Sequence, residues 1–264
     1  NIQNTGSITV GTPGASTANN LISGGILALS SPGWMIAPSE SIVNASTTAG
    51  VGGSVSINNS GYIAAYGNST FGVAALSIGN SGILSNSSAT TNNYYMGNGA
   101  STNSTNSNGG SASVYNNGAI IVAGQGTAGI IAIANGDGGL ISNIASPVIP
   151  STATITTNPI TKIQTTNAII GTTAGNNSGT YTANGGAVSV NNPNSVYTGI
   201  SGGGGETSIG ILAQSIGGGG GYAGGTNYIV RVGDTGGAGG TGGSVTVTST
   251  GVVSTLNDGS IGIL

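Results

Sequence analysis

The sequence predicts an all-β protein, a right-handed parallel β-helix (β-solenoid) with glycine-, asparagine- and serine-rich loops between its rungs. Three observations lead to this prediction. A short strand of alternating aliphatic and polar residues occurs five times, a small turn residue follows each copy at a fixed distance, and a glycine before an aliphatic residue recurs after that. Fixed spacing within units that lie at unequal distances from one another is typical of rigid rungs joined by variable loops.

The first strand of each rung supplies the predicted interior. Along Val55–Ile57 and Val188–Val190, aliphatic residues alternate with serine, so the aliphatic side chains share one face of the strand. Stacked rungs would bury that face, and each buried Val or Ile should contribute about 1.5–3 kcal/mol. The predicted core residues are Ile8, Val10, Val55, Ile57, Ala112, Val114, Val188, Val190, Val245 and Val247.

The turn after the first strand and the start of the third strand carry the repeat glycines. Glycine and asparagine tolerate the backbone angles of tight turns, and a second short strand separates these two positions. The predicted turn residues are Gly14, Gly61, Gly118, Asn194 and Gly251. The predicted third-strand glycines are Gly25, Gly72, Gly129, Gly210 and Gly262. A helical interpretation fails because glycine, asparagine and β-branched residues recur too often for a helix interior.

Residues 1–264 are therefore predicted to form a single β-solenoid repeat domain, with rungs that begin near residues 7, 54, 111, 187 and 244. The long stretch over 135–186 contains enough apolar residues to suggest a further strand or a partial rung. The sequence ends on Leu264, within the fifth repeat, and we therefore expect a fragment of a longer chain.

The charge content argues against two classes of partner. Charged residues make up 3% of the chain, and its two cations, Lys162 and Arg231, cannot neutralise several phosphates, so we expect no nucleic acid partner. They also provide no basic patch for a membrane surface, and no apolar run reaches the length of a membrane span. The mean hydropathy of +0.21 is nevertheless high enough for the aliphatic residues to order the chain.

The residues needed for catalysis are sparse. The chain has no histidine, so a Ser-His-Asp arrangement is impossible, and its five acidic residues are widely spaced. Calcium requires several oxygen ligands, whereas the glycine runs near Gly217 and Gly233 lack regular acidic residues. We predict no catalytic, metal or cofactor-binding residues and no cofactor. Arg231 and Asp234 are the only oppositely charged residues that lie close together in the sequence. An enzyme acting on polysaccharide is therefore only the third-ranked alternative.

The segment SIGILAQSIGGGGG, Ser208 to Gly221, resembles a repeat in the passenger domains of large Gram-negative autotransporter adhesins. Degenerate forms of the phrase begin at Phe71, Ala128 and Gly259. The resemblance implies a secreted right-handed β-helix displayed beyond the outer membrane, often an adhesin or a biofilm component. It transfers no functional residues, since the phrase is structural. The family's translocating barrel, signal peptide and protease motif are not in this sequence, so the display route is inferred.

We therefore expect a non-catalytic structural or adhesive segment of a secreted bacterial surface protein, which provides reach and surface contacts in adhesion or biofilm. Its low charge, amides and hydroxyls suit neutral partners, such as a host surface, a glycan, a matrix or further copies of the chain. Its nine tyrosines are expected mainly to decorate the face of the solenoid, with stacking on sugars as the alternative. The alternative is a self-assembling extracellular fibre or sheath subunit, because the open ends of a solenoid present unpaired strand edges.

Overall fold

The computed structural model describes residues 1–13, 23–30, 35–37, 50–67, 70–79, 83–85, 108–124, 126–136, 168–171, 184–199, 208–217, 221–224, 231–232, 240–256 and 260–264. Within these ranges the protein is all-β, its larger sheets are parallel and no helix occurs, which confirms the predicted class. In particular, no helix among the described residues is long and apolar enough to cross a bilayer.

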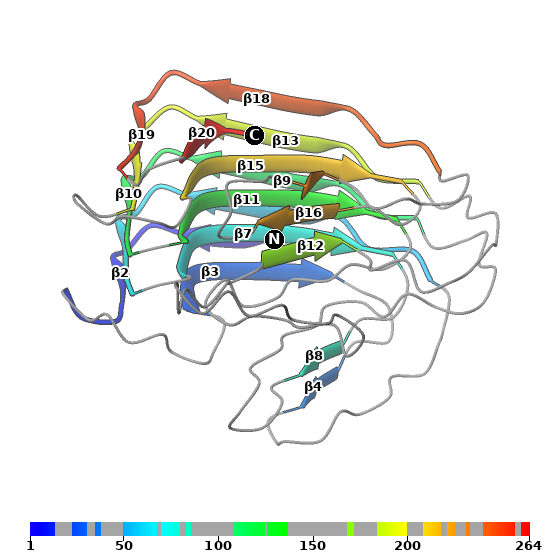
Figure 1. The fold of residues 1–264 in the computed structure, drawn as a ribbon, viewed down its shortest axis with the longest axis horizontal. Helices are drawn as coiled ribbons and strands as arrows, with labels where there is room; N and C mark the ends of the chain where they lie inside the picture. Colours follow the sequence, from blue (N-terminus) through cyan, green and yellow to red (C-terminus); the bar gives the residue numbers. More distant parts are fainter. Residues whose placement is uncertain are drawn as a thin grey trace, which may run out of the picture.

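Three parallel sheets form a column in which each rung gives one strand to each sheet (Figure 1). Sheet A contains β1 (Ile2–Asn4), β5 (Val55–Asn59), β9 (Ala112–Asn116), β13 (Val188–Asn192) and β18 (Val245–Ser249). Sheet B contains β2 (Ile8–Val10), β6 (Ile63–Tyr66), β10 (Ile120–Ala123), β14 (Val196–Thr198) and β19 (Val253–Thr255). Sheet C contains β3 (Ser23–Ser30), β7 (Thr70–Ile78), β11 (Ala128–Asn135), β15 (Ile209–Ile216) and β20 (Ile261–Ile263).

The first rung differs from the prediction. Its strand in sheet A is Ile2–Asn4, which pairs with β5, whereas Ile8–Val10 pairs with β6 in sheet B. The rung therefore begins near residue 2 and not near residue 7. Ile8 and Val10 alternate with a polar residue, as the aliphatic residues of a first strand do. The local pattern alone therefore predicts a strand of sheet A here, which is wrong. The structural counterpart of Gly61 is Gly6, against whose carbonyl oxygen Gly61 packs, and Gly14 lies outside the described residues.

Aliphatic side chains from all three sheets meet inside the column. Ile57 pairs with Val114, which pairs with Val190, so equivalent residues of successive rungs lie directly above one another. Among the predicted core residues, six are buried: Val55, Ile57, Ala112, Val114, Val188 and Val190. Three others are partly buried against this core: Ile8, Val10 and Val247. Val245 departs from the prediction and is 46% exposed, because β18 is the last strand of sheet A and no further strand covers it.

A column of asparagines continues the interior at the corner where sheet A ends. Asn4 donates from Nδ2 to Oδ1 of Asn59, Asn59 donates likewise to Asn116, and Asn116 to Asn192, each at 2.7 Å. Asn192 then donates to Oγ of Ser249 at 3.0 Å. Asn59, Asn116 and Asn192 are fully buried, and the amide-to-amide bonds satisfy polar groups that would otherwise be costly to bury.

The glycines near the start of the third strands form a second column, inside sheet C and facing side chains of sheet B. A Cβ atom on Gly129 would lie 2.6 Å from the carbonyl oxygen of Gly210 in the next rung, and the same closeness holds for Gly25 and Gly72. Gly262 is the exception, since a Cβ there would meet nothing within 4 Å. The repeat glycines therefore permit the close approach of successive backbones, except where no rung follows.

The long stretches between rungs all leave the column at the same corner, after a strand of sheet C and before the next strand of sheet A. Those after the first and second rungs pair with each other through β4 (Met35–Ala37) and β8 (Ile83–Ser85), which are parallel. Those after the third and fourth pair through β12 (Ala168–Gly171), β16 (Gly221–Gly224) and β17 (Arg231–Val232), which are antiparallel. The further strand expected over 135–186 is therefore present as β12.

Sheet C is apolar on both faces. Its inward residues, such as Val73 and Ile130, join the main core, while outward residues such as Leu76, Ile133 and Leu212 form a second buried cluster. Strands buried on both sides read as nearly continuous apolar runs, as in TFGVAALSI over Thr70–Ile78. Sheets A and B are thus the sheets whose outer faces carry exposed side chains.

Candidate interaction surface

The outer face of sheet A is an exposed, polar surface. Strands β5 and β9 share a burial pattern in which the second and fourth residues face outward while the others are buried. Because side chains alternate along a strand, the outward residues of the five rungs align in two columns. Successive strands are separated by about 4.8 Å, so the members of each column are regularly spaced along the stack.

One column combines amides with an aromatic ring, and we call it the amide–tyrosine column. Its members pair in register from rung to rung and are all exposed: Gln3, Asn58, Tyr115, Asn191 and Thr248. Tyr115 is 43% exposed and lies between Asn58 and Asn191. A rigid aromatic surface thus has a carboxamide on either side, and each carboxamide can both donate and accept hydrogen bonds.

The second column consists of hydroxyl groups, and we call it the hydroxyl column. Its members also pair in register: Ser56, Ser113, Ser189 and Thr246. Ser113 donates a weak hydrogen bond of 3.4 Å to the backbone oxygen of Val55. The two columns together offer neutral donors and acceptors at regular intervals, a pattern suited to a polar, uncharged ligand.

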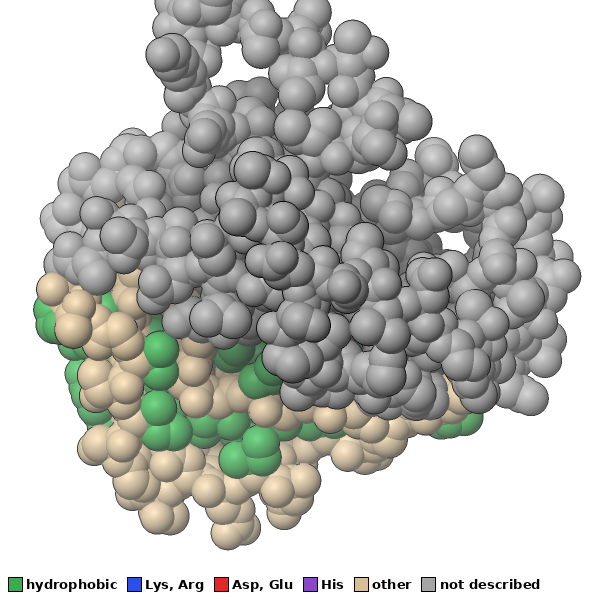
Figure 2. Space-filling model, turned by 90° about the horizontal axis from the view of Figure 1, so that it is seen from below, with side chains coloured by type: hydrophobic (Ala, Val, Ile, Leu, Met, Phe, Trp, Pro, Cys, Tyr) green, Lys and Arg blue, Asp and Glu red, His purple; other side chains and the backbone are tan. Residues whose placement is uncertain are grey.

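Charge is missing from this surface. None of its nine column members is Lys, Arg, Asp or Glu. Figure 2, which looks along the stack from the β3 side, likewise shows only hydrophobic and neutral side chains on the described atoms in view. An ionic ligand would therefore lose its hydration on these faces without gaining an opposite charge.

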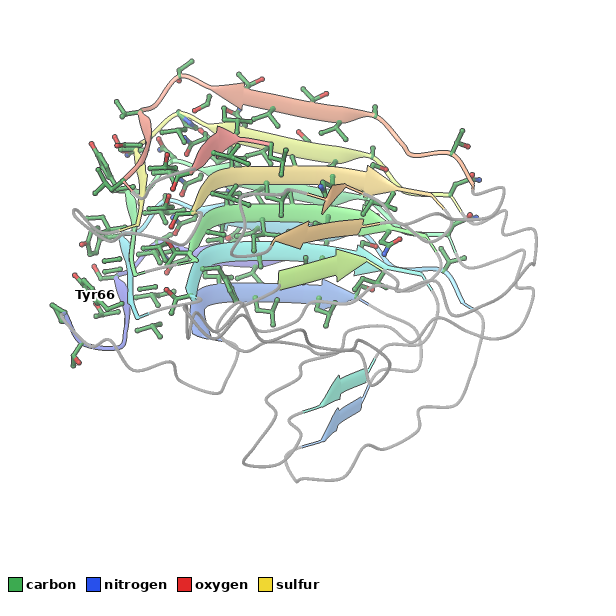
Figure 3. The ribbon with its side chains drawn as sticks, in the orientation of Figure 1. Tyr66 is labelled. Atoms are coloured by element: carbon green, nitrogen blue, oxygen red, sulfur yellow. The ribbon has the colours of Figure 1, made fainter. Side chains whose placement is uncertain are left out.

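Tyrosines also mark the outer face of sheet B. Tyr62 precedes β6 and is 39% exposed, Tyr66 ends β6, and Tyr197 in β14 is 40% exposed. Figure 3 shows Tyr66 at the sheet B side of the column. Partial burial raises the pKa of the Tyr62 hydroxyl, and the neighbouring Tyr66 raises it further through charge repulsion and a side-chain hydrogen bond.

The last rung presents a different kind of surface. Within the described part of the chain, strands β18, β19 and β20 each pair with a strand on one side only. Four apolar side chains of this rung are about half exposed: Val245, Val252, Leu256 and Ile263. A further rung stacked on this one would bury these side chains.

The acidic residues considered for catalysis and metal binding all fall outside the described residues: Glu40, Asp137, Glu206, Asp234 and Asp258. Lys162 lies outside them as well, and Arg231 is described only as part of β17. Among the residues that the structure describes, no three His, Cys, Asp or Glu side chains gather where they could hold a metal ion.

The sequence interpretation missed two features of the rungs. The asparagine column is not among the predicted features, although the pattern aliphatic-x-Asn-x-Gly occurs at Ile2–Gly6, Ile57–Gly61 and Val114–Gly118. A glycine pair precedes the first strand in four rungs, and Cβ atoms on Gly110, Gly186 or Gly243 would collide with the backbone of the previous rung. The same fixed spacing that revealed the other repeat glycines identifies this pair.

Comparisons with known protein families, with curated proteins and with solved structures found no match. The function is therefore inferred from the sequence and the geometry of this chain.

Proposed function

We propose that the chain is a non-catalytic structural and adhesive segment of a secreted bacterial surface protein, with a right-handed β-helix that provides reach and outer faces that make contacts. The observation that carries the proposal is the column itself, five rungs joined by continuous backbone pairing and buried ladders. Rungs of this kind extend in one direction and expose the same kind of face at each level. The autotransporter-like phrase at Ser208–Gly221 supports a location at the cell surface.

Attachment assays test this proposal directly. The chain is fused to an inert outer-membrane anchor in a non-adherent bacterium, and attachment to host-cell monolayers and biofilm mass are measured. We expect both to rise above those of the anchor alone. The matched control is the displayed Val188→Asp variant, in which a buried core position receives a carboxylate and the faces lose their support. Equal attachment by the anchor, the variant and the natural chain would refute the proposal.

A second candidate function is a self-assembling extracellular fibre or sheath, and the continuous register from rung to rung favours it. Val253 follows Ile8, Ile63, Ile120 and Val196 in one column, so a first rung from another copy could continue the same register. Such head-to-tail contacts do not close on themselves and would give filaments. Electron microscopy distinguishes the two functions: filaments that Ile263→Asp abolishes would support assembly, whereas isolated rods would argue against it.

A further inference from the structure

We propose that the amide–tyrosine column binds a neutral glycan, with the ring of Tyr115 stacked on a sugar and the amides of Asn58 and Asn191 bonded to its neighbours. This inference rests on the proposed adhesive function and specifies what the adhesive face recognises. Tyr115 is the only aromatic residue among the nine members of the two columns on sheet A, and pairing in register places it between the two asparagines.

The ring of Tyr115 is exposed on the outer face of sheet A. Tyr115 leaves 43% of its surface exposed, and its side chain points away from a buried strand core. An aromatic ring held on a rigid strand offers a large contact area with little loss of side-chain freedom. The apolar C–H face of a pyranose is a suitable partner for such a ring, because the contact buries apolar surface on both sides.

The amides on either side of Tyr115 can form hydrogen bonds with the neighbouring sugars. Asn58 and Asn191 lie one rung to either side of Tyr115, so about 10 Å separates their strands. That separation spans neighbouring sugars when a chain lies along the stack. A carboxamide has two donors and an acceptor, and it can therefore bond to vicinal hydroxyls of either orientation. The hydroxyl column, in which Ser113 and Ser189 lie two residues before Tyr115 and Asn191 on the same face, adds further donors and acceptors.

Charge decides which glycan is favoured. The two columns carry no Lys or Arg to pair with a carboxylate or sulfate, so acidic polysaccharides lack a counter-charge on this face. A neutral sugar loses only hydroxyl hydration, and the face can replace those hydrogen bonds. The inferred ligand class is an extended neutral oligosaccharide or polysaccharide.

Calorimetric titration of the purified 264-residue chain with neutral oligosaccharides of glucose, mannose, galactose and N-acetylglucosamine tests the proposal, with heparin as the acidic comparison. We expect at least one neutral oligosaccharide to bind and heparin to bind more weakly. Tyr115→Ala should weaken binding about tenfold, the equivalent of about 1.4 kcal/mol. Tyr115→Phe, which keeps the ring, should retain most of the affinity, while Asn58→Ala and Asn191→Ala should each lower it several-fold.

Tyr197→Ala is the matched control, because Tyr197 is 40% exposed but lies on sheet B, and it should bind as the natural chain does. Thermal melts monitored by circular dichroism verify that each variant is folded. The proposal is overturned if no neutral oligosaccharide binds, if Tyr115→Ala binds normally, or if Tyr197→Ala weakens binding equally. Sedimentation that shows a dimer dispersed by Tyr115→Ala, without glycan binding, would assign the face to a second copy and would also overturn it. Adhesion without glycan binding would overturn this inference while leaving the proposed function intact.

Discussion

The carboxamide of Asn59 donates a hydrogen bond of 2.7 Å to that of Asn116, although 57 positions separate the two residues in the sequence. Both side chains are fully buried, and each also bonds to the next asparagine of the column. These bonds fix how successive rungs align with one another. A shift of one rung along its strand direction would break the asparagine hydrogen bonds to the rungs on either side.

Asn116→Ala is expected to destabilise the column strongly. The change leaves Nδ2 of Asn59 and Oδ1 of Asn192 without their partners in a buried site, at about 1–3 kcal/mol for each group. Urea denaturation measures the loss in the free energy of unfolding. The exposed Asn191→Ala should change it by less than about 0.5 kcal/mol. Similar midpoints for the two variants would show that the buried bonds contribute little.

Gly129→Ala should destabilise the protein, whereas the equivalent change at Gly262 should be tolerated. A Cβ on Gly129 would lie 2.6 Å from the carbonyl oxygen of Gly210 and would overlap the side chain of Val196. Overpacking of this kind costs about 1–3 kcal/mol. Gly262 has nothing within 4 Å of that position. Differential scanning calorimetry compares the two melting temperatures, and a drop of equal size in both would contradict the stacking of these glycines.

Val188→Asp and Ser189→Asp place the same carboxylate on opposite faces of β13. Val188 is 2% exposed, so its replacement buries an unpaired charge and should prevent folding or lower stability by several kcal/mol. Ser189 faces solvent, and its replacement should be nearly neutral. Circular dichroism and urea titration compare the variants. The assigned faces are wrong if Ser189→Asp is the more harmful change.

Alkaline pH should weaken the fold around Tyr62. Its pKa in the folded protein is raised above the ordinary value of 10.0, first by burial and then by Tyr66. The folded state therefore holds the phenolic proton more tightly than the unfolded chain does. This gives no change in stability below about pH 10 and a loss as pH rises beyond it.

Absorbance titration of tyrosinate measures this effect. Tyr66→Phe removes both the charge and the hydrogen-bond partner, so it should move the pKa of Tyr62 back toward its ordinary value. Tyr197→Phe, in the same sheet but two rungs away, is the control and should leave it in place. An unchanged Tyr62 titration in Tyr66→Phe would mean that the two phenols are not coupled.

The alternation of Val188, Ser189 and Val190 predicts which side chains of β13 are buried, because a period of two has only one geometric interpretation in a strand. The glycine at Gly129 was likewise predictable from its constant spacing. The position of Ile8 was not, since β2 resembles a first strand locally and only its pairing with Ile63 assigns it to sheet B. Pairing between rungs is a long-range property that single-strand patterns do not contain.

The candidate site could also be predicted only in part from the sequence. Alternation predicts that Tyr115 faces outward, but its position between Asn58 and Asn191 depends on which residues of three separate rungs pair with one another. The half exposure of Val245 also could not be predicted from its pattern, which is identical to that of the buried Val188. What separates them is whether another rung lies above.

Every long insertion leaves the column at the corner between sheets C and A. Unrelated sequences can therefore be exchanged at this corner without a change in the three sheets. The entropy of closing a longer excursion grows only slowly with its length. A foreign peptide grafted between β7 and β9 would therefore leave the faces of sheets A and B as they are. Sequence change could accumulate at this corner while selection preserves the outer faces of sheets A and B.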